Sequence, residues 1–148
     1  QCHPGCEEGH RKASCLVIAH FIWKCHYYCF GSRCQFRIAS LRKACHNKLT
    51  HFNLWQEFAW GAFGDTHEAR DDTARYALEL AREKLGADLE PVDLLIIGDT
   101  ERDIQCARAI GARVLAVATG MESMEELAGH QPDFLVKDLT EITAEELA

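Results

Sequence analysis

From about residue 47 onward, apolar runs alternate with segments that have helical spacing. Residues 71–87 (DDTARYALELAREKLGA) repeat apolar side chains every three or four positions, which predicts a helix with a stop at Gly86. Residues 92–98 (VDLLIIG) and 113–120 (RVLAVATG) are short and continuously apolar, as expected for strands covered on both faces. Residues 102–111 (RDIQCARAIG) between them predict a short helix.

Two Ser/Thr-x-x-Glu patterns predict further helix starts. Ser123 stands three residues before Glu126, and Thr143 stands three residues before Glu146, the spacing of a capping box. Residues 132–138 (PDFLVKD) between them predict a third, shorter strand. Helices and strands that alternate in this way imply crossover connections and a parallel sheet. We therefore predict an α/β fold, a Rossmann-like parallel sheet flanked by helices and incomplete at its N-terminus.

Two carboxylates follow the strand predicted at 92–98. Asp99 comes directly after Gly98, and Asp103 falls in the first turn of the next helix. In parallel α/β sheets, ligands bind beyond the carboxyl ends of the strands, and carboxylate oxygens are ligands that Mg²⁺ prefers. Both acids can therefore face one crevice and hold Mg²⁺. In the alternative, Asp99 or Thr100 only caps the helix and Asp103 only interacts with its dipole.

The first 46 residues differ in composition from the rest. Only two acidic residues, Glu7 and Glu8, precede Glu57. Of the eight cysteines, Cys106 alone lies beyond this part of the chain. The others are Cys2, Cys6, Cys15, Cys25, Cys29, Cys34 and Cys45. We therefore divide the chain into a Cys/His-rich segment of uncertain origin, residues 1–46, and a second part, residues 47–148.

Net charge and hydropathy argue against several partners. The formal net charge of −7 disfavours nucleic acids and anionic membranes. The apolar run CLVIAHFIW is interrupted by His20, is too short to span a bilayer and lacks a signal-peptide cleavage pattern. We expect a cytoplasmic protein without a nucleic-acid or membrane partner, and the oligomeric state stays open. Because the chain begins with Gln1, we also expect a fragment or a processed chain.

Residues 94–120 (LLIIGDTERDIQCARAIGARVLAVATG) resemble the fourth motif of the haloacid dehalogenase-like hydrolases and the strand that follows it. Residues 48–87 resemble the phosphoglycolate-phosphatase-like branch, so the resemblance runs from about residue 47 to the end. It implies a phosphatase with an aspartate nucleophile, an aspartyl-phosphate intermediate and Mg²⁺. It also implies that Asp99 and Asp103 serve the metal and that Arg70 holds the substrate phosphate. An ordinary surface arginine is the alternative for Arg70.

The family's nucleophile motif, Asp-x-Asp-x-Thr after a hydrophobic strand, is absent. No aspartate precedes Asp65, and Ser32 and Ser40 lack the context expected of the second motif. We predict that the parent protein hydrolyses a small phosphate monoester, so that its partner is a small phosphorylated metabolite. This chain lacks the residue for the covalent step, and we expect it to be inactive, or nearly so, by itself.

The Cys/His-rich segment has several explanations. Cys2 with Cys6 and Cys25 with Cys29 form pairs at spacings that Zn²⁺ sites use, so a non-enzymatic zinc-binding protein on a degenerate hydrolase half is the alternative function. A disulfide framework would need an oxidising compartment. A shifted reading frame, a gene fusion or a wrongly assigned start would explain the segment as non-native, and a divergent native segment is the last explanation.

Four shorter features complete the expectations. Residues 14–23 can pair as a strand, and residues 36–49 have helical spacing. Cys106 is expected to be a buried small residue. The turn Thr119–Gly120 either borders the site of the two acids or is only a loop. A cluster of aromatic residues is predicted to be core, with a substrate pocket as the alternative: Trp55, Phe58, Trp60 and Phe63.

Overall fold

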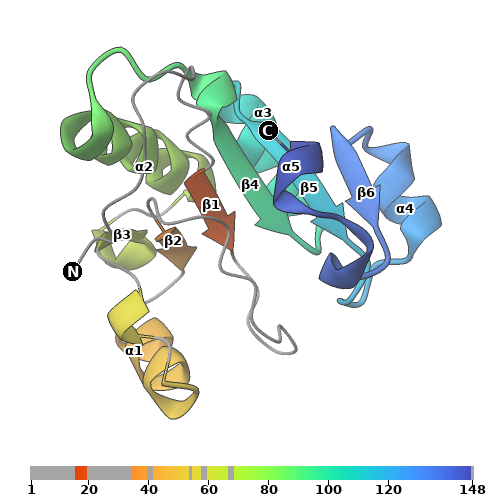
Figure 1. Ribbon diagram of the computed structural model, residues 1–148, viewed down its shortest axis with the longest axis horizontal. Coiled ribbons are helices and arrows are strands. Elements are labelled where there is room, and N and C mark those ends of the chain that lie inside the picture. The colour runs from red at the N-terminus through yellow and green to blue at the C-terminus, as the bar shows by residue number, and fades with distance from the viewer. Residues whose placement is uncertain are drawn as a thin grey trace.

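The computed structural model describes residues 16–19, 35–39, 42–53, 55–57, 60–66 and 69–147. The strands of these residues form one six-stranded sheet in the order β3-β2-β1-β4-β5-β6 (Figure 1), and every neighbouring pair is parallel. The predicted α/β fold is confirmed. The strands are β1 (Leu16–Ala19), β2 (Gln35–Ala39), β3 (Trp60–Phe63), β4 (Leu94–Gly98), β5 (Arg113–Val117) and β6 (Phe134–Val136).

Helices lie between consecutive strands from β2 to β6, and helices cover both faces of the sheet. Figure 1 shows α3 behind the sheet and α5 in front of it. None of the described helices is long and apolar enough to cross a membrane. The α-helices are α1 (Arg42–His51), α2 (Arg70–Leu85), α3 (Glu101–Ile110), α4 (Met124–Gly129) and α5 (Ala144–Leu147). The 3-10 helices are η1 (Trp55–Glu57), η2 (Gly64–Thr66), η3 (Pro91–Asp93) and η4 (Leu139–Glu141).

Strand β4 has an apolar core on each of its faces. Ile96 packs in a cluster that includes the buried side of α2 and residues of α3. Ile97 packs in a second cluster with Leu147 of α5. Because successive side chains of a strand point to opposite faces, a strand covered on both sides must be apolar throughout. This explains why residues 94–97 show no alternation of apolar and polar side chains.

Two strands of the N-terminal part lie inside this sheet. Strand β1 pairs with β2 on one side and with β4 on the other, where Ala19 lies opposite Ile97. The strand expected within residues 14–23 is thus confirmed. The division predicted after residue 46 falls inside α1, and the origin of residues 1–46 stays a prediction.

The helix suggested by the spacing of residues 36–49 is only partly right. Residues 35–39 form β2, where Phe36 pairs with Trp60 and Ile38 with Ala62, and the helix starts only at Arg42. Pairing on both edges of β2 outweighs a weak helical spacing over so few residues.

The predicted helix boundaries are largely confirmed. The Ser123 Oγ accepts a hydrogen bond from the Glu126 backbone at 3.3 Å, and the Glu126 carboxylate accepts one from the Ser123 backbone at 2.7 Å. Thr143 and Glu146 make the equivalent backbone-to-carboxylate bond at the start of α5. Gly86 follows α2 at φ 139° and ψ 140°, a positive φ outside the left-handed helical conformation that its position suggested.

Candidate functional site

Asp99 and Asp103 both lie near the carboxyl end of β4. Asp99 directly follows the last residue of the strand, and Asp103 lies in the first turn of α3. Both side chains are buried, with exposed fractions of 5% and 4%. A buried carboxylate is costly unless hydrogen bonds or a cation compensate for the lost water. Two such groups at one strand end therefore need a specific explanation.

Thr100 orients one of these carboxylates. It occupies the N-cap position of α3, but its side chain makes no capping hydrogen bond to the helix backbone. Its hydroxyl instead donates to the Asp103 Oδ2 at 2.7 Å. Helix capping by the Thr100 side chain, the alternative considered from the sequence, is therefore not what the structure shows. The hydroxyl holds the Asp103 carboxylate against the turn between β4 and α3.

Two glycines make room for the acids. A β-carbon on Gly98 would stand 2.2 Å from the Asp103 Cβ, and a β-carbon on Gly120 would stand 2.2 Å from the Asp99 Oδ2. Both distances are far below ordinary van der Waals contact, so only glycine fits at these positions with the acids as they lie. Gly120 also shows that the loop after β5 borders the acid pair, one of the two roles considered for it.

Glu122 is a site-edge residue that sequence reasoning missed. It lies two residues after Gly120, and its Oε2 accepts a hydrogen bond from the Glu101 backbone at 2.8 Å. A carboxylate at this position satisfies an amide of the first turn of α3 and suits the helix dipole. The contact joins residues that are 21 positions apart, and no local sequence pattern predicts it.

Arg70 is the first residue of α2, at the same edge of the sheet. Helix α2 follows β3 in the chain and leads back across the sheet, so its start lies near the carboxyl ends of the strands. Two strands, β2 and β1, separate β3 from β4. The side chain of Arg70 lies outside the described part of the structure, and its phosphate-binding role stays a prediction.

The donor set suits a hard cation. Asp99 and Asp103 offer carboxylate oxygens, and Mg²⁺ is usually held by one or two carboxylates together with water. Among the residues that the structure describes, no group of three His, Cys, Asp or Glu side chains could hold a metal ion. The two acids can therefore supply part of a magnesium shell, with water and substrate oxygens as the remaining ligands.

Several sequence candidates lie outside the described residues. Cys106 is inside them and is buried in the core with α2 and α3, as predicted. Cys45 is buried against Leu49. The zinc and disulfide hypotheses stay predictions, because most of their residues are not described. The candidates outside the description are Cys2, Cys6, Cys15, Cys25, Cys29, Cys34, Ser32, Ser40 and Phe58.

The aromatic cluster divides between core and cavity. Trp60 packs against the main core, as predicted. Trp55 and Phe63 pack against a smaller cluster of Cys45 and Leu49 and also line a cavity of about 690 Å³ beside β3. The core interpretation is confirmed for Trp60, and the substrate-pocket alternative stays a prediction.

A known family model matches the part of the chain that contains the acid pair. Residues 72–142 match the HAD-hydrolase-like family model, and this range contains Asp99, Asp103 and Gly120. Over these residues the chain is similar to the haloacid dehalogenase-like hydrolases. The resemblance drawn from the sequence is confirmed at this level.

Part of the chain is also similar to a named bacterial protein. A stretch of 67 residues of this chain is 34% identical to the pyrophosphatase PpaX of Bacillus pumilus. The match covers 45% of this chain and 30% of the pyrophosphatase. The chain thus spans less than a third of this relative.

Solved structures of similar fold include proteins whose names read haloacid dehalogenase-like or phosphatase. A haloacid dehalogenase-like protein of Streptococcus pneumoniae matches with a TM-score of 0.61 and 23% identity, over 72% of this chain and 49% of the other. A "predicted phosphatase" of Clostridium acetobutylicum matches with a TM-score of 0.59 and 23% identity, over 72% and 50%. The chain spans about half of each solved structure, and the likeness supports the fold.

Proposed function

We propose that this chain carries the magnesium-binding half of a phosphatase site and that the parent protein hydrolyses a small phosphate monoester in the cytoplasm. The main support for this proposal is that Asp99 and Asp103 are both buried at the end of β4, where Gly98 and Gly120 leave room for them. Mg²⁺ bound there would neutralise charge on a phosphoryl group. Arg70, at the same sheet edge, would bind phosphate oxygens in a bidentate manner.

The sequence offers no aspartate where the family's nucleophile motif is expected. Strand β1 lies beside β4 at the centre of the sheet, and the family's nucleophile motif follows a hydrophobic strand. After Ala19 the sequence continues with His20, Phe21 and Ile22, and no aspartate precedes Asp65. Without a carboxylate to attack phosphorus, an aspartyl-phosphate cannot form. We therefore propose that this chain binds Mg²⁺ and a phosphate ester but does not hydrolyse the ester.

A magnesium titration tests the first half of this proposal. The full chain is titrated with Mg²⁺ by calorimetry and by NMR of the Asp side-chain carboxyl carbons. We expect saturable binding in the unmodified chain and at least about tenfold weaker binding in Asp99→Asn, which loses a charged ligand. Asp88→Asn removes the same charge at an exposed position after α2 and should leave the affinity unchanged. Equal affinity in Asp99→Asn and the unmodified chain would refute the metal site.

A phosphatase assay tests the second half. p-Nitrophenyl phosphate should be hydrolysed with Mg²⁺ at the background rate by both the unmodified chain and Asp99→Asn. A magnesium-dependent rate that Asp99→Asn abolishes would show that the chain is an active phosphatase and that the inactivity proposed here is wrong.

A further inference from the structure

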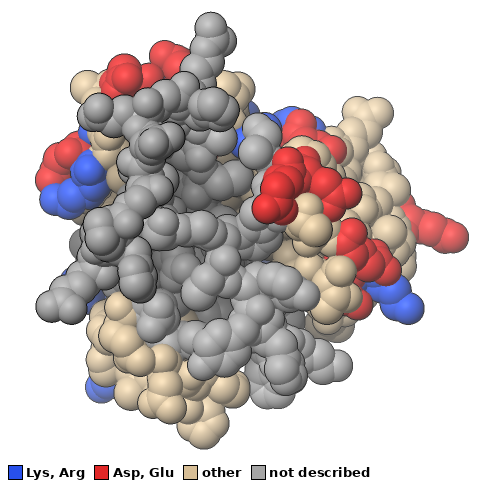
Figure 2. Space-filling model, in the orientation of Figure 1, with Lys and Arg blue, Asp and Glu red and all other residues tan. Residues whose placement is uncertain are grey.

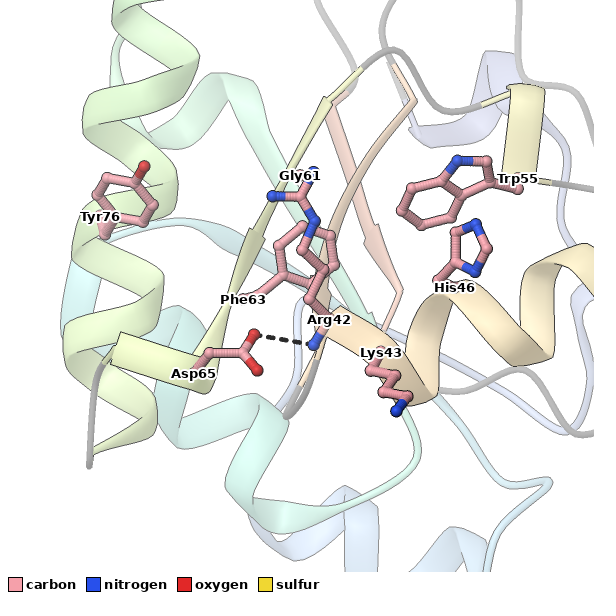
Figure 3. A pocket seen from close by; sticks show the side chains of 8 residues that line it. All are labelled: Arg42, Lys43, His46, Trp55, Gly61, Phe63, Asp65 and Tyr76. Carbon is pink, nitrogen blue, oxygen red and sulfur yellow. Dashed lines mark hydrogen bonds between the residues drawn. The ribbon is translucent and has the colours of Figure 1, made fainter.

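The cavity beside β3 is a second site, separate from the acid pair. Strand β3 is at one edge of the sheet, three strand positions from β4. At a spacing of about 4.8 Å per strand, the carboxyl ends of β3 and β4 are about 14 Å apart. Ala62 belongs to the core cluster beneath α2, whereas Phe63 packs with α1 residues on the opposite face. Since both α1 and α2 contribute lining residues, the cavity reaches around the outer edge of β3 (Figure 3).

One wall of the cavity is cationic. Arg42 and Lys43 open α1 and both line the cavity. The Arg42 guanidinium carbon lies 5.3 Å from the centre of the Phe63 ring, a cation–π arrangement that holds the guanidinium over β3. Figure 3 shows this guanidinium beside Gly61, where the strand has no side chain. The wall thus offers two cations to an anionic group.

A carboxylate sits at the end of this wall. The Asp65 Oδ2 accepts a hydrogen bond from the backbone nitrogen of Arg42 at 2.8 Å, so this bond uses the main chain and not the guanidinium. The lining therefore carries two cations and one carboxylate, on a chain whose net charge is −7. On the face of the molecule in Figure 2, by contrast, acidic side chains gather around α5. A carboxylate has several lone pairs and can also accept from a ligand hydroxyl or amino group.

The other wall is aromatic. The rings of His46 and Trp55 meet edge to face, with centroids 4.6 Å apart. Trp55 is fixed at its base by the small core of Cys45 and Leu49. Tyr76 lies on α2, across β3 from this pair (Figure 3), and its phenol is partly exposed. Aromatic side chains held in this way offer flat surfaces against which a planar ring can pack.

We propose that this cavity binds a small anion with a planar ring, the chemical class of a nucleoside monophosphate. The ring packs against Trp55, the anionic group lies at Arg42 and Lys43, and a hydroxyl or amino group donates to Asp65. The volume of about 690 Å³ lies within the range of about 300–1,000 Å³ that small-molecule sites occupy. This proposal does not depend on magnesium or on phosphatase activity.

Calorimetry with adenosine monophosphate tests the proposal on the full chain. EDTA is present, so that the acid pair cannot contribute through a metal. We expect saturable binding of the nucleotide and at least about tenfold weaker binding of adenosine and of inorganic phosphate. Adenosine lacks the anionic group that contacts Arg42 and Lys43, and inorganic phosphate lacks the ring that packs against Trp55. Arg42→Gln should weaken nucleotide binding about tenfold and leaves the backbone bond to Asp65 in place. Lys137→Gln removes an exposed cation at the far edge of the sheet and should change nothing.

Three results would overturn the proposal: no heat with the nucleotide at millimolar concentration, unchanged affinity in Arg42→Gln, or loss of binding in Asp99→Asn. The last result would place the nucleotide at the acid pair instead. Circular dichroism melting confirms that each variant is folded. If Arg42→Gln unfolds, Lys43→Gln is measured instead, with the same tenfold expectation, and unchanged affinity there counts equally against the proposal.

Discussion

Gly120 lies against the carboxylate of Asp99, so closely that a β-carbon on residue 120 would stand 2.2 Å from Oδ2 and 2.8 Å from Cγ. The loop after β5 therefore limits where this carboxylate can point. The same loop is fastened to α3 through Glu122 and the backbone of Glu101. The orientation of Asp99 is thus determined by a segment that follows it by 21 residues, as well as by its own turn.

Gly120→Ala should displace the Asp99 carboxylate. We expect at least about tenfold weaker Mg²⁺ binding and a loss of about 1–3 kcal/mol in the free energy of unfolding, because the added methyl group overpacks a closed site. Calorimetric titration and urea denaturation measure the two effects. Gly129→Ala is the matched control, since a β-carbon there meets nothing within 4 Å. If the two variants bind Mg²⁺ equally well, the contact between Gly120 and Asp99 does not orient the Asp99 carboxylate for metal binding.

Thr100→Val should destabilise the fold by about 1–3 kcal/mol. The substitution keeps the shape of the side chain but removes the hydroxyl that donates to the buried Asp103 carboxylate at 2.7 Å. A buried acceptor that loses a donor keeps its desolvation cost. Urea denaturation measures the change. Thr100→Ser retains the hydroxyl and should lose clearly less stability, and equal losses in both variants would indicate that the methyl group matters instead.

The site could be predicted in part because its two acids are local in the sequence. An apolar strand followed by Gly-Asp-Thr is visible without any structure. Helix α3 lies within one residue of its predicted range, and β4 starts at Leu94, two residues after the predicted start, because residues 91–93 form η3. The contacts that complete the site are not local. Gly120 reaches Asp99, and Glu122 reaches Glu101, only because β5 pairs with β4, and a linear pattern does not contain that pairing.

The fold was least predictable toward the N-terminus. Strand β2 has only five residues, and periodicity over so short a run cannot separate a strand from a helix. Its identity is determined by the neighbours β1 and β3. The cavity beside β3 could not be predicted from the sequence either. Its lining residues come from separate segments that are brought together only by the pairing of the strands.

The capping box of α4 should make stability depend on pH. Hydrogen bonds from the Ser123 backbone, and then from its side chain, lower the pKa of Glu126 below its ordinary value of 4.5. A lowered pKa in the folded state stabilises the fold above the unfolded value, and this contribution is lost as pH falls through the folded pKa. We therefore expect the unmodified chain to melt at a higher temperature than Glu126→Gln at pH 7. The difference should shrink below about pH 4.5.

Melting curves of both proteins between neutral and acidic pH check this prediction. Glu125→Gln removes the same charge one residue earlier and leaves the Ser123–Glu126 hydrogen bonds intact. It should therefore show a smaller pH-dependent difference from the unmodified chain. A difference between Glu126→Gln and the unmodified chain that is constant across this range would contradict the assigned role.

Arg113→Met should loosen α5. The Arg113 guanidinium donates to the carbonyl oxygens of Leu147 at 2.7 Å and Val92 at 2.9 Å, and it thereby ties the last helix to the segment before β4. Without these bonds we expect amide exchange in α5 to accelerate about tenfold or more, since hydrogen bonds from charged groups are worth about 1.5–3 kcal/mol each. Hydrogen exchange measures the effect. Arg102→Met replaces an exposed arginine of α3, and equal acceleration in this variant would argue against the tie.

The central position of β1 has a consequence for synthesis. Leu16 pairs with Leu94, so one edge of β1 stays unpaired until the ribosome has synthesised β4, 78 residues later. At about 5–20 residues per second, a ribosome needs on the order of ten seconds to deliver that partner. During this interval the nascent chain exposes an apolar strand with unpaired amides, the kind of surface that chaperones bind and that aggregates grow from. Slowing translation between β3 and β4 should therefore lower the soluble yield of this protein.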